Sequence, residues 1–222
     1  DVIEALGQQV RAVAVDLRGS GNSRDAAGPY RLERFAADLR ELTNELELNP
    51  VVLVGHSMGA TVALRFALDA PTMTRGLVLI APVPASGGGY SPKGEAYLRA
   101  TTGDPAAARN WLSRTFAGAP DKAALERLCD AAAKSARNSA LESFESWAHA
   151  DFAEETREIQ APVLVIAPER DAPDASERKV AALLPTVRHV VLADCAHYAI
   201  VEKPKEIASL IRDFLALTGT SP

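Results

Sequence analysis

Cysteine is scarce in this sequence, since only Cys129 and Cys195 occur among its 222 residues. Two cysteines do not make the disulfide framework that small secreted proteins use. No apolar run approaches the length of a membrane span, and no signal peptide is visible at the start. These absences predict a cytoplasmic protein in a reducing compartment, with no membrane among its partners.

An excess of positive charge is also lacking. Lysine and arginine number 24 against 29 acidic residues, the formal net charge is −5, and no long basic run occurs. A nucleic-acid partner is therefore not expected. The sequence shows no internal repeat and no low-complexity tract. Its length and its hydrophobic fraction of 47% are those of one globular domain with a sizeable core and room for an insertion.

Short apolar runs alternate along the chain with helical patterns. The apolar runs predict strands at residues 10–16, 51–54, 76–81, 162–167 and 187–192. Helical spacing predicts a helix that ends at Gly7 and further helices at residues 30–48, 60–68, 175–184 and 204–217. Such alternation with apolar strands is typical of a mostly parallel sheet covered by helices on both faces, so the fold class is α/β.

A helical block interrupts this alternation. Residues 91–160 are rich in alanine, and breaks at residues 103–105 and 118–121 predict three or four short helices. The chain therefore divides into a first core part at residues 1–84, a helical cap insertion at 85–160 and a second core part at 161–222. Aromatic side chains of the insertion either pack a small helical layer or line a substrate pocket, and these are Trp111, Phe116, Phe144, Trp147 and Phe152.

The most informative stretch is residues 55–59, Gly-His-Ser-Met-Gly, which follows an apolar strand and precedes a helix. This G-x-S-x-G pattern in this context predicts a nucleophile elbow, a sharp turn that exposes the Ser57 hydroxyl at the carboxyl edge of the sheet. The helix N-terminus behind Ser57 favours negative charge, and the Met58 N–H can donate to an oxyanion.

A second glycine-rich stretch, residues 18–23, follows the first predicted strand and invites a dinucleotide-binding interpretation. The third glycine of G-x-G-x-x-G is missing, because Arg24 stands in its place, and no helix starts at once. We therefore expect no nucleotide site here. Neither an organic cofactor nor a metal is expected elsewhere in the chain.

A serine nucleophile needs a base within hydrogen-bonding reach, and four histidines are available. His56 lies inside the elbow and should point away from the serine, His149 lies in the insertion, and His189 lies within the last strand. His197 follows the carboxyl end of that strand, where catalytic groups collect in open parallel sheets. His197 is the predicted base.

The base needs an acid that fixes its tautomer and stabilises its cation. Glu169, Asp171 and Asp174 all follow the strand at residues 162–167, and Asp194 is a further candidate close to the base. Asp171 is preferred because the order of nucleophile, acid and base along the chain is that of hydrolase sheets. Asp174 and Glu169 remain alternatives.

Together these motifs resemble the α/β-hydrolase family of cap-bearing esterases, C–C hydrolases, perhydrolases and related acyltransferases. Residues 16–23 are similar to the family's D-x-R-G-x-G-x-S loop, whose Arg and Gly residues are mainly structural, and residues 55–59 match its elbow. Pro168 and Ala196 stand where glycines are usual, which alters loop shape but keeps the three side chains. A serine at position 57 argues against haloalkane dehalogenases and epoxide hydrolases, which use an aspartate.

The resemblance also implies parts that this sequence lacks. The family's first oxyanion donor lies in a His-Gly loop before the helix that ends at Gly7, and three N-terminal strands are expected before or between the strands predicted here. A missing middle strand would orphan buried polar groups, at about 1–3 kcal/mol each. We therefore expect these residues to be the C-terminal part of a longer protein, with the second oxyanion donor outside this sequence.

The resulting hypothesis is a serine hydrolase that cleaves a small carboxylic ester or a similar acyl substrate. Ser57 is the nucleophile, His197 the base, Asp171 the acid and the Met58 N–H one oxyanion donor. The alternatives are an acyltransferase, perhydrolase or C–C bond hydrolase with the same residues, and a non-catalytic ligand-binding protein of this fold. The partner is a small acyl molecule, and the substrate and the oligomeric state stay open. Cys195 lies near the base in sequence, and packing is its expected role.

Overall fold

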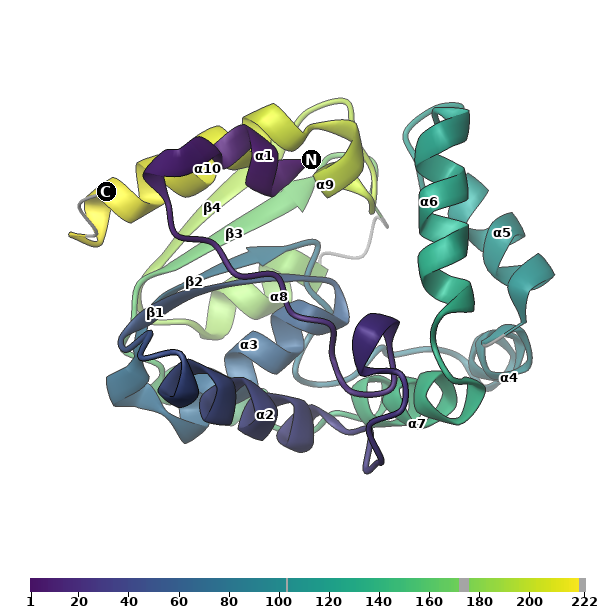
Figure 1. Cartoon of the computed structure of the whole chain (residues 1–222), viewed down its shortest axis with the longest axis horizontal. Helices are drawn as coiled ribbons and strands as arrows, with labels where there is room; N and C mark the ends of the chain where they lie inside the picture. Colours follow the sequence, from purple (N-terminus) through teal and green to yellow (C-terminus); the bar gives the residue numbers. More distant parts are fainter. Residues whose placement is uncertain (103, 172–175, 220–222) are drawn as a thin grey trace.

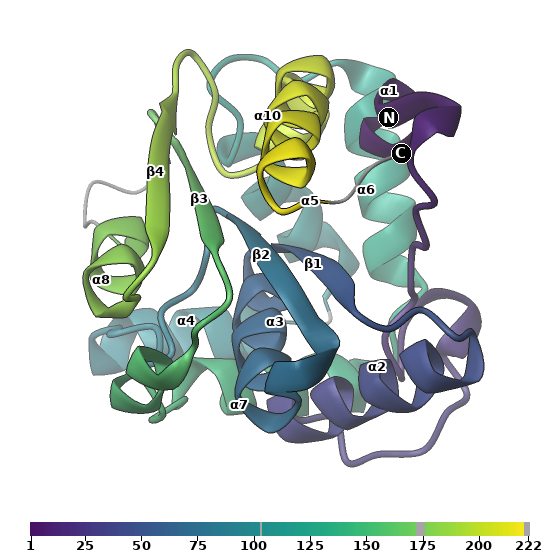
Figure 2. The same ribbon diagram turned by 90° about the vertical axis from the view of Figure 1, so that its left-hand side faces the viewer.

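A four-stranded parallel sheet forms the centre of the computed structural model, which describes residues 1–102, 104–171 and 176–219. The strands lie in the order of the chain, as Figure 2 shows. They are β1 (Val51–His56), β2 (Thr74–Ile80), β3 (Val163–Pro168) and β4 (Val187–Leu192). All three pairs are parallel, which confirms the predicted sheet.

The sheet is covered on both faces because side chains of its inner strands alternate between two cores. Leu77 and Leu79 of β2 belong to one apolar cluster, whereas Val78 and Ile80 belong to the other, and all four are at most 1% exposed. A strand buried on both faces reads as a continuous apolar run, which explains why these strands were predictable.

The helices form two layers on these faces (Figure 1). The first layer contains α2 (Leu32–Glu45), α3 (Met58–Asp69) and α8 (Ser176–Leu183), and the second contains α1 (Val2–Leu6) and α10 (Pro204–Leu217). A short helix, α9 (Ala199–Glu202), was not predicted. Single 3₁₀ turns lie at Gly7–Gln9, Gly21–Ser23, Pro71–Met73 and Glu154–Glu158. None of the helices in the described part of the chain combines the length and apolar character that crossing a membrane requires.

The predicted strand at residues 10–16 is wrong. This segment contains no strand, and Val13 and Val15 are 48% and 41% exposed. A strand requires a hydrogen-bonded neighbour, and among the residues that the structure describes β1 pairs only with β2. Val54 of β1 is accordingly 49% exposed. Residues 10–16 do have an apolar pattern typical of a strand, but no strand of the described chain pairs with this segment.

In the part of the segment between β2 and β3 that the structure describes, four helices form a block beyond the carboxyl ends of the strands (Figure 1). They are α4 (Pro92–Thr101), α5 (Pro105–Arg114), α6 (Lys122–Ala133) and α7 (Arg137–Ala148). The side chains of Ser91, Asp104 and Asp121 accept from backbone N–H groups of the first turns of α4, α5 and α6. Asp104 and Asp121 lie at the two predicted breaks, and Ser91 lies where the helical stretch was predicted to begin, so the expectation of short helices is confirmed.

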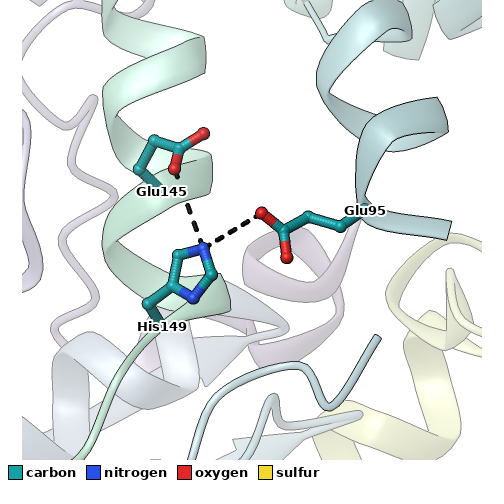
Figure 3. A group of neighbouring side chains, drawn as sticks. All are labelled: Glu95, Glu145 and His149. Carbon is teal, nitrogen blue, oxygen red and sulfur yellow. Dashed lines mark hydrogen bonds and ion pairs between the residues drawn. The ribbon is translucent and has the colours of Figure 1, made fainter. Parts of the chain in front are cut away.

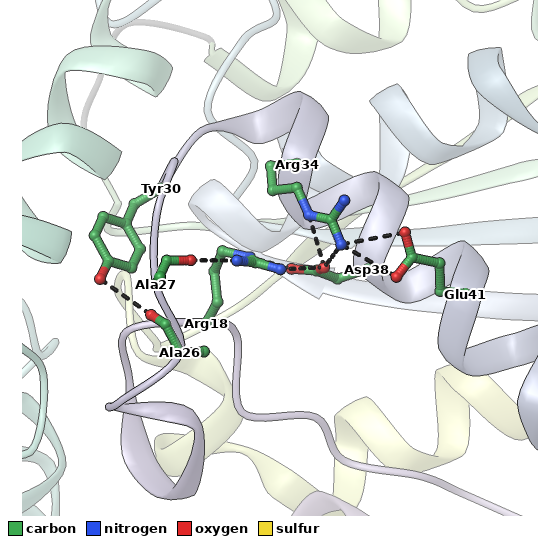
Figure 4. A network of polar contacts seen from close by, with 7 residues as sticks. All are labelled: Arg18, Ala26, Ala27, Tyr30, Arg34, Asp38 and Glu41. Atoms are coloured by element: carbon green, nitrogen blue, oxygen red, sulfur yellow. Dashed lines mark hydrogen bonds and ion pairs between the residues drawn. The ribbon is translucent and has the colours of Figure 1, made fainter.

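The glycine-rich loop after residue 16 is tied to the first helical layer (Figure 4). Arg18 donates to both carboxylate oxygens of Asp38 on α2, at 2.5 and 2.6 Å, and also to the carbonyl of Ala27. Although partial burial opposes ionisation, the Arg18 and Arg34 guanidinium groups lower the pKa of Asp38 below its ordinary value. Gly19 has φ 80°, and a Cβ there would lie 2.2 Å from the Ser139 hydroxyl oxygen. The loop is thus a structural joint between α2 and α7.

Candidate active site

Ser57 occupies the sharp turn between β1 and α3. Its φ is 54° and its ψ −124°, a conformation that a non-glycine residue adopts only where the surroundings enforce it. The Ser57 N–H donates to the carbonyl of Ile80 at 3.0 Å, so β2 holds the turn from the side. A Cβ on Gly55 would lie 2.3 Å from the carbonyl oxygen of Gly59, which explains the glycine before the serine. The local geometry is that of the predicted elbow.

The structure brings Ser57, His197 and Asp171 together from three separate segments. The Nε2 atom of His197 lies 3.1 Å from the Ser57 hydroxyl oxygen, and its Nδ1 atom lies 2.7 Å from a carboxylate oxygen of Asp171. The side chains of His197 and Asp171 are only 16% and 19% exposed. A continuous hydrogen-bonded chain therefore connects the carboxylate to the hydroxyl.

The partners determine where the protons lie in this chain when the imidazole is neutral. A carboxylate only accepts hydrogen bonds, so Nδ1 of His197 carries the hydrogen and donates to Asp171. The lone pair of Nε2 then faces Ser57, whose hydroxyl donates to it. This tautomer is the one in which histidine can remove a proton from the serine.

The other acid candidates have different partners. Glu169 accepts from the backbone N–H of Asp194 at 3.0 Å, and Asp194 forms an ion pair with Arg170 at 2.7 Å. Both carboxylates thus shape residues 193–198, which we call the base loop, instead of contacting the imidazole. Asp174 lies outside the described residues. Asp171 is the carboxylate that the described structure places on His197.

His56 connects the elbow, of which it is part, to the base loop. Its Nε2 atom donates to the backbone carbonyl of His197 at 2.7 Å, and the two rings are 4.9 Å apart. Burial, together with the neighbouring His197 ring, lowers the pKa of His56 to about 4. His56 is therefore neutral at neutral pH and supports the base loop. His189 is exposed on β4, at the edge of the sheet.

Cys195 is fully buried in the core beneath α10, and its thiol donates to the carbonyl of Leu192 at 3.3 Å. Burial raises the pKa of this thiol to about 11. A protonated, buried thiol is neither a nucleophile nor a metal ligand at neutral pH. Its packing role in the base loop agrees with the expectation from the sequence.

Aromatic side chains of the helical block divide into two groups. Phe144 and Phe152 are buried, and Phe144 packs edge-on against Trp147. Trp111 of α5 is instead 38% exposed and lies edge-on to the His197 ring, with centroids 6.0 Å apart. Trp111 also packs against Tyr198, a residue that the sequence analysis did not single out. Burial raises the pKa of Tyr198 to about 12, so its ring serves as an uncharged wall beside the base.

A cluster away from Ser57 has the residue types of a metal site (Figure 3). Glu95 of α4 accepts from His149 Nε2 at 3.1 Å, and Glu145 of α7 lies 3.8 Å from the same nitrogen. Arg99 pairs with both carboxylates, at 3.2 Å from Glu95 and 2.6 Å from Glu145. Because this guanidinium already pairs with both carboxylates, we interpret the cluster as an ion-pair network that joins α4 to α7. Glu95 and Arg99 also line an open cavity of about 410 Å³, which does not include Ser57.

Comparison with known proteins identifies the class of this chain. Residues 1–210 match the alpha/beta hydrolase family. A soluble epoxide hydrolase of Corynebacterium sp. (strain C12) is 34% identical over 84 residues, which cover 38% of this chain and 29% of that protein. "Putative carbamate hydrolase RutD" of Escherichia coli O9:H4 (strain HS) is 26% identical over 229 residues, covering 96% of this chain and 84% of that protein. The first curated relatives are matched over 22–30% of their own length.

Among solved structures, an esterase (EaEST) from Exiguobacterium antarcticum is similar with a TM-score of 0.82 and 17% identity. That similarity covers 90% of this chain and 80% of the esterase, and at this identity it concerns the fold alone. With the match over residues 1–210, these findings show that the chain belongs to the alpha/beta hydrolase family. The resemblance seen in the sequence and the α/β-hydrolase fold are confirmed.

Proposed function

We propose that the protein is a serine hydrolase that cleaves a small carboxylic ester or a similar acyl substrate. The observation that carries this proposal is the chain of two hydrogen bonds from Asp171 through His197 to the Ser57 hydroxyl, at 2.7 and 3.1 Å. Such a chain activates a hydroxyl that is otherwise a poor nucleophile at neutral pH. Family membership agrees with hydrolysis, and the choice of substrate rests on the site alone.

The reaction runs in two steps. Ser57 attacks the acyl carbon while Nε2 of His197 takes its proton, and Asp171 stabilises the imidazolium that forms. His197 then returns the proton to the leaving group, which departs and leaves an acyl-enzyme on Ser57. Water then attacks the acyl carbon while it gives a proton to the same nitrogen. His197 returns this proton to the Ser57 oxygen as the bond between that oxygen and the acyl carbon breaks, which releases the acid. Every proton thus passes through Nε2, the atom that faces Ser57.

The negative charge on the acyl oxygen needs donors that are already in position. Met58 is the first residue of α3, so its N–H has no acceptor within the helix. We assign one half of the oxyanion hole to this group. Loss of one such donor costs about 10²–10³ in turnover, so a second donor is also part of the proposal.

The helical block α4–α7 acts in this proposal as a cap over the substrate. The Trp111 and His197 ring centroids lie 6.0 Å apart, so an apolar side chain stands beside the base, which favours an apolar group on the acyl or leaving side.

The test is hydrolysis of p-nitrophenyl acetate, butyrate and octanoate, with a p-nitrophenyl carbamate in parallel. We expect turnover by the natural full-length protein and at least a 10³-fold loss in Ser57→Ala. Ser209→Ala, an exposed serine on α10, is the matched control and should retain wild-type rates. Equal rates in wild type and Ser57→Ala would refute the proposal. Added alcohol or peroxide that captures the acyl group in preference to water would instead favour the transferase or perhydrolase alternative.

A further inference from the structure

One carboxylate connects the cap to the base loop. Glu202 of α9 accepts from the backbone N–H of Ala117 through Oε1 and from the backbone N–H of Ala196 through Oε2, both at 2.8 Å. Ala117 lies in the connection between α5 and α6, residues 115–121, whereas Ala196 immediately precedes His197. Hydrogen bonds to an ionised carboxylate are stronger than those between neutral groups. Glu202 makes two of them, with segments that lie far apart in sequence.

Further contacts join the same two segments. Arg170 donates to the carbonyl of Ala117 at 3.3 Å and pairs with Asp194 of the base loop at 2.7 Å. The Phe116 ring stacks on Tyr198, with centroids 5.6 Å apart and planes at 17°. The N–H and the C=O of Ala117 are therefore both held by residues of the hydrolase core. Connection 115–121 is fastened to the loop that carries the base.

We propose that Glu202 is a positioning residue that makes the placement of His197 depend on the seating of connection 115–121. The reason is geometric, since the peptide before His197 and the peptide at Ala117 share one rigid carboxylate. If the connection lifts, Glu202 and the Ala196 peptide lose their common support, and the imidazole moves relative to Ser57. Misplacement of a reacting group by about 1 Å can cost up to 10²-fold in rate. The role of Glu202 in catalysis rests on the function proposed above, whereas the hydrogen bonds that link connection 115–121 to the base loop do not.

The first test is hydrogen–deuterium exchange with Glu202→Gln, because the glutamine side chain has the size of glutamate but only one acceptor oxygen. Glu206→Gln is the matched control, an exposed glutamate on α10 whose carboxylate lies 4.0 Å from Lys203. We expect faster exchange in the peptides covering residues 115–121 and 193–198 of Glu202→Gln, and no change in Glu206→Gln. Faster exchange in only one of the two peptides would overturn the coupling.

The second test is kinetic and uses the full-length protein. We expect kcat/KM of Glu202→Gln on p-nitrophenyl esters to fall at least tenfold, with a shift in the midpoint of the acid limb of its pH profile. A smaller folded fraction would lower the rate without moving that midpoint, so the profile separates positioning from stability. Faster exchange in both peptides with an unchanged kcat/KM and pH profile would refute the positioning role and leave the hydrolase proposal intact.

A third test acts on the cap side alone. Ala117→Pro removes the N–H that donates to Glu202, and Ala119→Pro places the same ring at an exposed position two residues later. Faster exchange at residues 193–198 in Ala117→Pro, but not in Ala119→Pro, is the expected result. Equal exchange there in both variants would overturn the proposal. If the wild type cleaves no ester, the proposed function fails, and the exchange experiments still decide whether Glu202 couples the two segments.

Discussion

The two halves of the active site are held in different ways. The elbow at residues 55–59 is shaped by backbone contacts, because Gly55 allows the close approach of Gly59 and the Ser57 N–H donates to the backbone of β2. The base loop at residues 193–198 depends instead on side chains from elsewhere. Glu169, Glu202 and His56 each bond to its backbone. The nucleophile is thus positioned by backbone contacts, whereas the base is positioned by side chains that bond to the backbone of its loop.

This difference predicts which changes each half tolerates. An elbow that depends on backbone geometry should fail when a single Cβ is added at the wrong position. A loop that depends on several hydrogen bonds should lose its function in graded steps, according to which bond is removed. The three expected results below run from the largest effect to the smallest.

The largest effect is expected at the acid. Asp171→Asn can present an N–H to Nδ1 of His197, so the imidazole takes the wrong tautomer and kcat falls by about 10³–10⁴. Glu169→Gln is the control within the same loop region, and because Glu169 bonds only to the Asp194 backbone in the described contacts, its loss should stay near tenfold. Steady-state kinetics on a p-nitrophenyl ester measure both. An Asp171→Asn rate within tenfold of wild type would exclude Asp171 as the acid and return Asp174 to consideration.

The elbow offers a matched pair of glycines. In Gly55→Ala the new Cβ would lie 2.3 Å from the Gly59 carbonyl oxygen, and we expect the free energy of unfolding to fall by about 3 kcal/mol. In Gly59→Ala the Cβ meets nothing within 4 Å, and the better helix former should raise that free energy by about 0.5–1 kcal/mol. Urea unfolding measures both values. Equal stability of the two variants would contradict the claim that backbone approach shapes the elbow.

His56 joins the two halves and makes stability depend on pH. Above pH 6.5 it is neutral in both the folded and the unfolded chain, so its lowered pKa of about 4 has no effect. Below pH 6.5 His56 becomes protonated in the unfolded chain but stays neutral in the folded protein. The free energy of unfolding therefore falls by about 2 kcal/mol at pH 5. The fall levels off below pH 4. Urea unfolding at pH 7 and 5 should show this loss in wild type and a smaller loss in His56→Gln, which lacks the titrating group. Equal losses in the two proteins would contradict the assignment of the pH dependence to His56.

The contrast between the halves also explains what the sequence could predict. The elbow is visible as five consecutive residues, and the strands buried on both faces are visible as apolar runs. His197 and Asp171 were found because each follows a strand in a known order, and their contact in the structure agrees with that choice. Their roles in catalysis stay a proposal.

The parts that escaped prediction depend on contacts between distant segments. Glu202 stands on a four-residue helix without any motif, and only the fold brings Ala117 and Ala196 to its two oxygens. Tyr198 gave no signal apart from its place beside His197. The segment at residues 10–16 has the pattern of a strand, yet pairing is a property of two segments, and one segment cannot reveal whether its partner is there.

The edge of β1 has a consequence for handling this chain. Within the described residues no strand pairs with that edge, and Val54 stands exposed beside it. Free N–H and C=O groups in a row, next to an exposed β-branched side chain, are a template for strand addition by another molecule. A concentrated preparation of this chain is therefore expected to self-associate through β1, and Val54→Lys should weaken that association.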